Sequence, residues 1–459
     1  MSRPGADAGD NSALVGMLGG VNVPGSLDEF VNAIERPWGN IMRRRRDVSA
    51  EALPIPSVAI PWYALGRRPT SPSPKPSRTL AYAAADYFVQ DAGSLLALAA
   101  AEADSSALRG KWICDLCAAP GGKASALVEA VQTGGGEGFV LANEVIRGRL
   151  GALQLNLART GSDRYAISSL DPQALADQLP GAFDVVVVDA PCSGQALIAR
   201  GKRNRSALSI SQIEHSASRQ RRILDAALKM LRDGGWLIYS TCTFAEAENE
   251  AQVARLVDLC AAEPFPLGSL EPYRSGEASY RLWPHVHACA GSFAARLRVS
   301  GKPQQESKRR QGTRGRTQRP PSWPDWFEDR GPPARLWQLD SRLMGWPDDA
   351  PPWVESIAVA GPELAHRTGQ TWKPAHAAAL RRVETCAATR HLDLDAEAAK
   401  RYLRGETIAI ETNGWQVARY RGRPLGWIKG SGGVGKNHLP ASARTRGELA
   451  DEGAEPRAV

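Results

Sequence analysis

Short apolar runs alternate with longer amphipathic segments between residues 111 and 299. Strands buried on both faces of a sheet are expected in the almost entirely apolar runs WICDLC, FVLAN, FDVVVVDAP and GGWLIYSTC. Residues 211–232 place apolar side chains at helical spacing, and Gly234 and Gly235 are expected to end that helix. This alternation predicts an α/β fold with a parallel sheet covered on both faces.

The pattern on either side of this region predicts smaller units. A short helix is expected after Ser26, which can cap its first turn, whereas the Pro/Ser-rich segment 69–78 is expected to hold no regular element. Residues 80–100 are expected to lead into the sheet and to end in a helix. The segment 301–322 has seven Lys and Arg against one Glu, which predicts a flexible basic arm. Short strands predicted towards residue 446 favour a small α+β or β-barrel-like unit.

Composition narrows the class of protein. The 459 residues carry a net charge of +8 and a pI near 9.2, which favours a polyanionic partner such as nucleic acid, although a merely basic enzyme remains an alternative. Seven cysteines, an odd number, are typical of reduced thiols in the cytoplasm. We expect no signal peptide and no membrane span, because neither apolar pattern is present. Four consecutive arginines, Arg43 to Arg46, could meet phosphates or form a solvated turn.

The loop after the first predicted strand could bring its backbone amides close to a ligand. This loop consists of Cys117, Ala118, Ala119, Pro120, Gly121, Gly122 and Lys123. The loop lacks the spacing of a dinucleotide fold and Pro120 removes a donor, so an amino-acid-like ligand suits it better than a phosphate. Glu144 ends the next strand, where an acid can bind both hydroxyls of a ribose. Asp171 could hold an adenine amino group, or it could simply cap a helix. Together these positions predict an adenosine-bearing cofactor.

Two cysteines each follow a predicted buried strand, Cys192 in DAPCSG and Cys242 in YSTCT. Ligands bind at the carboxyl edge of such sheets, and two thiols there indicate one step of attack and one of release, as in methylation of carbon 5 of a pyrimidine. Asp189 can hydrogen-bond the amino group and ring nitrogen of a cytosine, and Lys123 can lower the pKa of a thiol or contact the base or its phosphate. No metal is expected, because the CxxC of Cys114 and Cys117 has no second Cys/His pair at ligand spacing.

The chain resembles the Nol/Nop/Sun family of RNA cytosine-5 methyltransferases over residues 80–299. The resemblance rests on the motifs VQDAGSLL, DLCAAPGGK, ANE, DAPCSG, the QxxIL that begins at Gln220, YSTCT with ENE, and RLWPH. It implies a Rossmann-like class I methyltransferase sheet and S-adenosyl-L-methionine as cofactor. In that family the cysteine after Ser-Thr attacks and the one after Pro assists release, which implies these roles for Cys242 and Cys192. DNA methyltransferases attack with the Pro-Cys thiol instead, so YSTC indicates RNA.

Residues 414–440 resemble the PUA-like region of the RsmF branch of that family, which implies small-subunit ribosomal RNA as substrate and partner. The expected organisation is an N-terminal region with its linker (1–78), a methyltransferase domain (79–300), the basic arm (301–322), a C-terminal PUA-like RNA-binding region (323–446) and a tail (447–459). Two alternatives remain: a transfer-RNA cytosine-5 methyltransferase, and a non-catalytic RNA-binding factor in ribosome assembly. The oligomeric state is open, and a monomer is assumed.

Overall fold

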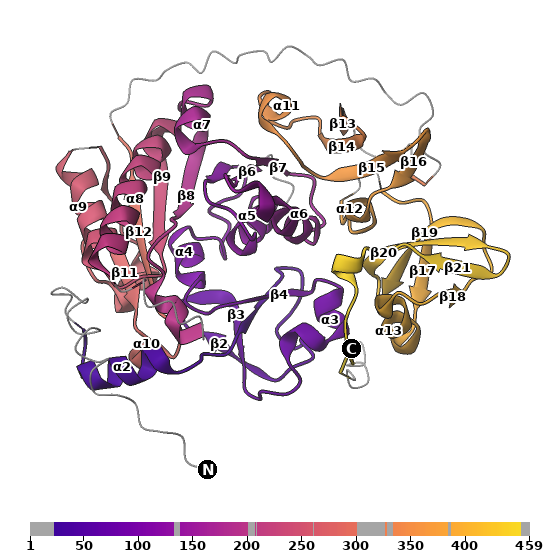
Figure 1. The fold of residues 1–459 in the computed structure, drawn as a ribbon, viewed down its shortest axis with the longest axis horizontal. Helices are drawn as coiled ribbons and strands as arrows, with labels where there is room; N and C mark the ends of the chain where they lie inside the picture. Colours follow the sequence, from indigo (N-terminus) through magenta and orange to yellow (C-terminus); the bar gives the residue numbers. More distant parts are fainter. Residues whose placement is uncertain are drawn as a thin grey trace.

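An eight-stranded sheet forms the centre of the computed structural model, which describes residues 23–132, 138–200, 207, 209–259, 261–300, 326–327, 334–383 and 387–450 (Figure 1). Its order is β10-β12-β9-β8-β5-β6-β7, with β11 paired to β12. The five strands from β9 to β7 run parallel, and β12 is antiparallel to β9. The strands are β5 (Trp112–Asp115), β6 (Phe139–Asn143), β7 (Tyr165–Ser168), β8 (Phe183–Asp189), β9 (Leu231–Thr241), β10 (Glu263–Pro264), β11 (Ser279–Leu282) and β12 (Ser292–Arg298).

The chain order reverses between β5 and β8. From β5 the chain continues outwards through β6 and β7, and then returns to build β8, β9 and β12 on the other side. In open α/β sheets the loops at such a reversal leave a crevice outside the carboxyl ends of the strands, and ligands bind there. The loops after β5, β6, β8 and β9 are therefore the place to look for a site.

Helices cover both faces of this sheet, as the apolar strands predict (Figure 1). Successive residues of β5 point to opposite faces of the sheet. Ile113 packs in one hydrophobic cluster with Leu127 and Leu153. Cys114 packs in a second cluster with Leu175 and Leu224. The helices are α4 (Leu95–Ala100), α5 (Gly122–Gln132), α6 (Leu150–Ala158), α7 (Pro172–Gln178), α8 (Ile210–Met230), α9 (Glu250–Asp258) and α10 (Pro284–His287).

Two local expectations are wrong. Helix α8 ends at Met230, and Gly234 and Gly235 lie inside β9 instead of ending the helix. Gly234 has φ +71°, a backbone conformation that glycine adopts without strain, and it lies in the irregular first part of β9. The segment 69–78 does hold a regular element, the short 3₁₀-helix Pro76–Arg78, because Pro at the first position suits a helical turn.

A small antiparallel sheet precedes the central one, in the order β2-β3-β1-β4. The expected N-terminal helix is present as α2, although the Ser26 side chain makes no capping hydrogen bond. The segment 80–100 ends in a helix as expected, α4, and the part that leads into it forms a short helix and a strand. The elements are α2 (Leu27–Glu35), β1 (Ile41–Arg44), β2 (Ser57–Ile60), β3 (Tyr63–Pro69), α3 (Leu80–Ala83) and β4 (Tyr87–Gln90).

Two further sheets follow the central one in the chain. The first has the order β13-β14-β15-β16 and the second β17-β19-β20-β21-β18, and the expected strands near residues 407–437 belong to the second. The elements are β13 (Ala334–Leu339), β14 (Arg342–Pro347), α11 (Val354–Ile357), β15 (Glu363–Thr368), β16 (Thr371–Pro374), α12 (His376–Ala379), β17 (His391–Leu394), α13 (Ala396–Arg404), β18 (Ile408–Ala409), β19 (Gly414–Tyr420), β20 (Arg423–Ser431) and β21 (Val434–Asn437).

The first of these two sheets packs against the central one. Trp346 lies in the same hydrophobic cluster as Leu175 and Leu224, and its Nε1 donates a hydrogen bond to the Tyr165 carbonyl at 2.8 Å. Ile167 of β7 also forms a β-bridge with Ala360. The predicted basic arm 301–322 lies outside the described residues. Among the residues described, no helix is long and apolar enough to cross a membrane.

Candidate active site

The two strand-end cysteines lie side by side. Strands β8 and β9 are parallel neighbours with Asp189 opposite Ser240, so the loops that follow start at the same level. Sγ of Cys192 is 3.1 Å from Sγ of Cys242, and both side chains are partly buried. The hydrogen bond with Cys242, together with burial, raises the pKa of the Cys192 thiol well above its usual value. Cys192 therefore keeps its proton at neutral pH and can donate it towards Cys242.

Lys123 and Asp189 form an ion pair beside the thiols. Lys123 Nζ is 2.8 Å from Asp189 Oδ2, while Oδ1 of Asp189 accepts a hydrogen bond from Ser240 Oγ at 2.8 Å. Burial lowers the pKa of Lys123, but the carboxylate of Asp189 more than offsets this, so the pKa is raised overall. The sulfur of Cys242 contributes to the same rise. The ammonium group is therefore close enough to stabilise a thiolate at Cys242.

A buried carboxylate fixes the loop that carries Cys192. Glu248, from the ENE motif, is fully buried, and its Oε2 accepts hydrogen bonds from the Ser193 backbone N–H at 2.9 Å and from Gln220 Nε2 at 2.8 Å. The same Gln220 nitrogen donates to the Pro191 carbonyl at 3.2 Å. Sequence reasoning quoted Glu248 and Gln220 only as parts of motifs. Their contact required the fold, because 28 residues separate them in the chain.

The neighbouring Asn249 holds the loop that carries Cys242. Asn249 Nδ2 donates to the Thr243 carbonyl at 2.9 Å, and its Oδ1 accepts a hydrogen bond from Thr241 Oγ1 at 2.5 Å. The two thiols are thus positioned by consecutive residues of one short segment.

Residues Cys117 to Lys123 run from the loop after β5 into the first turn of α5, at the same sheet edge. Gly121 has φ +111°, which other residues rarely adopt, and a Cβ on Gly122 would lie 2.7 Å from Gln90 Nε2. Helix α6 holds the loop from outside, because Asn156 Nδ2 donates to the Pro120 carbonyl at 2.8 Å. The backbone of this segment thus forms a tight, fixed turn that a ligand can approach closely.

Glu144 and Asp171 lie at the ends of the next two strands. Glu144 is buried, with Oε1 accepting the Ile146 backbone N–H at 2.8 Å and Oε2 paired to Arg149 at 3.0 Å. A ribose would therefore share this carboxylate with Arg149. Asp171 is the N-cap of α7, since its Oδ1 accepts the Gln173 backbone N–H at 2.9 Å. The structure thus shows the capping alternative for Asp171, and its contact with adenine stays a prediction.

Sequence reasoning missed Asp115, the last residue of β5. It is 1% exposed, and neither carboxylate oxygen makes a well-formed hydrogen bond with a side chain or backbone group of the described residues. Burial and the nearby charge of Asp189 raise its pKa to about 7. An acid inside the apolar run WICDLC was the available signal. Such an orphaned carboxylate is suited to a cationic ligand group.

The expectation that the four arginines meet phosphates or form a solvated turn is wrong for Arg43. It is completely buried, pairs with Glu129 at 2.7 Å and places its guanidinium 4.4 Å from the centre of the Phe88 ring. Arg46 is also engaged, because it donates to backbone carbonyls, among them that of Ser105 at 2.8 Å. The run starts in the last two residues of β1, and Arg43 joins this strand to α5, where Glu129 lies.

Known proteins are similar in sequence to this chain in both its methyltransferase and its C-terminal parts. Residues 106–298 match the family described as 16S rRNA methyltransferase RsmB/F, and residues 389–445 match the methyltransferase RsmF PUA domain. The chain is 28% identical over 469 residues to ribosomal RNA small subunit methyltransferase F of Shigella boydii serotype 4, covering 92% of this chain and 94% of that protein. The corresponding protein of Klebsiella pneumoniae (strain 342) is 29% identical over 472 residues, with 92% and 94% covered.

Solved structures share the fold. A methyltransferase homolog protein from Pyrococcus horikoshii has a TM-score of 0.52 at 24% identity, covering 64% of this chain and all of that one. NSun6 from the same organism has a TM-score of 0.50 at 19% identity, covering 60% and 94%. Fold and site together define a Rossmann-like methyltransferase with a C-terminal PUA domain. The chain is therefore similar, over 92% of its length, to ribosomal RNA small-subunit methyltransferases, with an RsmB/F-type methyltransferase domain and an RsmF-type PUA domain.

Proposed function

We propose that this protein uses S-adenosyl-L-methionine to methylate carbon 5 of a cytidine in small-subunit ribosomal RNA, through a transient bond between Cys242 and the base. The observation that carries the proposal is the pair of thiols 3.1 Å apart, with the Lys123–Asp189 ion pair next to them. The relatives that cover this chain almost end to end carry the name of ribosomal RNA small subunit methyltransferase, which supports the choice of RNA.

The residues present fit this cofactor. Glu144 offers a carboxylate for ribose hydroxyls, and the orphaned Asp115 suits an amino group. Gly121 and Gly122 let the backbone at the start of α5 pack closely against Asn156 and Gln90. The apolar side chains of Val145 and Ile146 are 50% and 57% exposed beside Glu144 and suit the flat face of an adenine. Bound there, the cofactor supplies a methyl group on a sulfonium sulfur. The same residues Cys117 to Lys123, with Asp171 and Asp189, complete the proposed cofactor site.

The chemistry begins with addition of the Cys242 thiolate to carbon 6 of the cytosine, with Lys123 stabilising the thiolate. Asp189 accepts a hydrogen bond from the cytosine amino group, so charge is stabilised on the base as the Cys242 bond forms. Carbon 5 is then electron-rich and takes the methyl group. A water molecule then accepts the carbon 5 proton, and the electrons of that bond restore the ring double bond and expel Cys242 as a thiolate. Cys192 lies next to that sulfur and assists this release.

The target base must leave its stack to reach Cys242, which costs a few kcal/mol that protein–RNA contacts have to offset. The test is RNA that carries 5-fluorocytidine, since fluorine cannot leave carbon 5 as a proton does and the adduct is trapped. With methyl donor present, we expect a covalent complex whose cross-linked peptide contains Cys242. Absence of any complex with small-subunit ribosomal RNA would overturn the proposal.

The RNA itself is tested by bisulfite sequencing of total RNA with and without the gene. Loss of a methylated position in small-subunit ribosomal RNA is expected. Loss of a position in transfer RNA alone would favour the transfer-RNA alternative, and no loss together with RNA binding would favour the assembly factor.

A further inference from the structure

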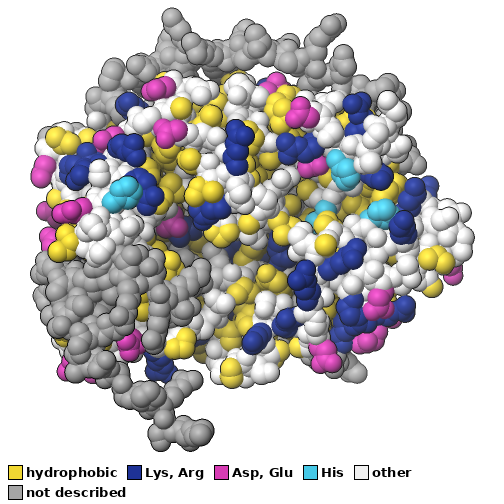
Figure 2. All heavy atoms as spheres, in the orientation of Figure 1, with side chains coloured by type: hydrophobic (Ala, Val, Ile, Leu, Met, Phe, Trp, Pro, Cys, Tyr) yellow, Lys and Arg dark blue, Asp and Glu magenta, His cyan; other side chains and the backbone are white. Residues whose placement is uncertain are grey.

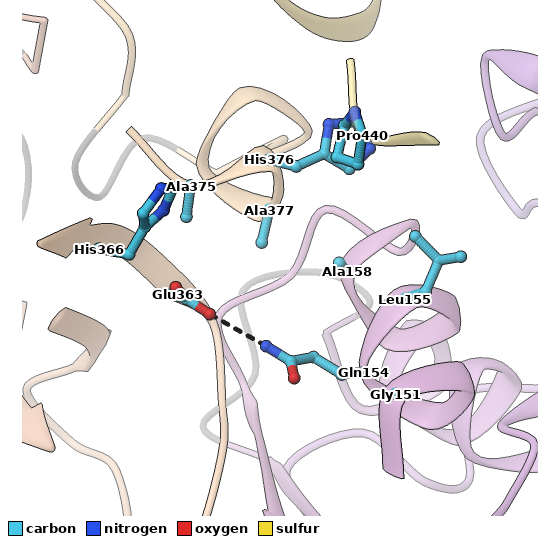
Figure 3. A pocket seen from close by; sticks show the side chains of 10 residues that line it. All are labelled: Gly151, Gln154, Leu155, Ala158, Glu363, His366, Ala375, His376, Ala377 and Pro440. Carbon is cyan, nitrogen blue, oxygen red and sulfur yellow. Dashed lines mark hydrogen bonds between the residues drawn. The ribbon is translucent and has the colours of Figure 1, made fainter. Parts of the chain in front are cut away.

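A cavity of about 190 Å³ lies between α6 and the C-terminal elements β15 and α12 (Figure 3). It is lined by Gly151, Gln154, Leu155, Ala158, Glu363, His366, Ala375, His376, Ala377 and Pro440. The opposite side of α6 contacts the candidate cofactor loop, where Asn156 binds the Pro120 carbonyl. One helix therefore separates this cavity from the candidate active site, and no residue of the proposed chemistry lines it.

The lining combines apolar walls with a polar edge. Leu155, Ala158 and Pro440 supply apolar surface, while Gln154 Nε2 donates to Glu363 Oε2 at 3.0 Å. Nδ1 of His376 is buried and has no hydrogen-bond partner in the described part of the chain. Burial, with the nearby charge of Arg159, lowers the pKa of His376 to about 4, so its ring is neutral at pH 7. The edge thus offers both donors and acceptors between apolar surfaces.

A group of exposed lysines lies on the rim side of this cavity. Lys373 of β16 is directly opposite His366 of β15, and Lys429 and Lys436 lie with it around His438. None of the three lysines has an acidic partner within ion-pair distance among the described residues. Figure 2 shows Lys, Arg and His side chains gathered over this part of the molecule. Such a surface attracts a polyanion.

The size of the cavity limits the ligand. Pockets for drug-sized molecules are typically about 300–1,000 Å³, so a space of about 190 Å³ accepts one flat ring system rather than a whole nucleotide. RNA is recognised in this way, by unpaired bases that stack on side chains and pair along their edges while phosphates remain outside. A neutral histidine, an amide and a carboxylate are suitable partners for the edge of a base.

We propose that this cavity binds one unpaired base of the substrate RNA, with the neighbouring phosphates on Lys373, Lys429 and Lys436. The inference rests on the proposed function in one respect, namely that the substrate is RNA. Binding of this base would hold the RNA against α6, on the side of the helix that faces away from the candidate cofactor loop.

Gly151→Leu tests the cavity directly. Gly151 lies in α6 with no other atom within 4 Å of an added Cβ, and leucine favours a helix more than glycine does, so the variant fills the cavity without disturbing the fold. Ala152→Leu is the matched control, because Ala152 is exposed on the same helix and does not line the cavity. Dissociation constants of the full-length variants are measured with protein-free 16S ribosomal RNA and with assembled small subunits.

We expect Gly151→Leu to weaken binding to protein-free RNA at least about fivefold, as loss of one stacked base does, and Ala152→Leu to bind within about twofold of the wild type. Ultraviolet cross-linking of the wild-type complex should attach RNA to peptides that contain His366 or His376. Unchanged affinity of Gly151→Leu would overturn the inference, as would weakening with assembled subunits alone, which would indicate a protein ligand. Failure of the 5-fluorocytidine complex would leave these binding results unaffected.

Discussion

Cys192 and Cys242 share a hydrogen bond between their sulfur atoms, 3.1 Å apart, although 50 residues separate them in the chain. The backbone N–H of Cys242 also points at the Cys192 sulfur, at 3.4 Å. A base bound to one of these sulfurs is therefore in immediate reach of the other. The negative charge of a Cys242 thiolate contributes to the raised pKa of Lys123, which supports different proposed tasks for the two thiols.

Replacement of each thiol by alanine should separate these tasks. Cys242→Ala should lower methyl transfer by at least about a thousandfold, because the step that activates carbon 5 is lost. Binding of S-adenosyl-L-homocysteine should stay within about twofold, measured by calorimetry. Cys192→Ala should instead accumulate an RNA–protein adduct, visible as a shifted band on a denaturing gel. Normal turnover of Cys192→Ala without an adduct would show that Cys192 has only a structural part.

The raised pKa of Asp115 should make the stability of the protein depend on pH in an unusual way. Its pKa is raised from 3.8 to about 7, so between these values the folded protein binds more protons and its stability falls as the pH rises. This rise corresponds to at most about 4 kcal/mol. Asp115→Asn should therefore be more stable than the wild type at pH 8 and no more stable at pH 4, as measured by urea unfolding.

The same variant should bind S-adenosyl-L-homocysteine more weakly, because the carboxylate proposed to meet its amino group is gone. Gain of stability at pH 8 without loss of cofactor affinity would contradict this role of Asp115 while leaving the buried-charge argument intact.

Arg43 should matter for stability and not for RNA. Arg43→Ala leaves Glu129 buried next to fewer positive charges, and loss of one partner of such a pair typically costs about 3–5 kcal/mol. We expect a lower free energy of unfolding, with an unchanged salt dependence of RNA binding by the folded protein. Lys429→Ala is the comparison: it should keep the stability and reduce the slope of affinity against salt by about 1.

Glu248 should act through the Cys192 loop. Glu248→Gln keeps the size of the side chain but replaces one oxygen by an NH₂ group, which cannot accept the hydrogen bonds from Ser193 and Gln220 in the same way. We expect kcat to fall about tenfold with the KM for cofactor unchanged, measured in steady-state assays. Glu246→Gln, exposed in the same short helix, should behave as the wild type. Equal kcat values for the two variants would contradict a positioning role.

The central fold and the meeting of the site residues were predictable because strand ends are readable in the sequence. Parallel strands deliver Cys192, Cys242 and Asp189 to one edge, and the first turn of α5 adds Lys123. The fate of Arg43 was not predictable. Four arginines look alike in sequence, and only the fold places Arg43 and Arg45 against Glu129.

Cavities and buried networks also escape sequence patterns. His376 and Gln154 lie in segments that show no motif, and the space between them exists only because α12 approaches α6. Asp115 was overlooked for another reason: its neighbours are apolar, so the run reads as an ordinary strand unless the missing partner of the carboxylate is known.

The packing of Trp346 limits where the protein can be cut into separate fragments. Because its indole belongs to the core of the methyltransferase part and bonds to Tyr165, a recombinant fragment ending at residue 300 would expose that core to water. When C-terminal domains are exchanged between related enzymes, the region around Trp346 should therefore be kept together with the methyltransferase domain that it packs against.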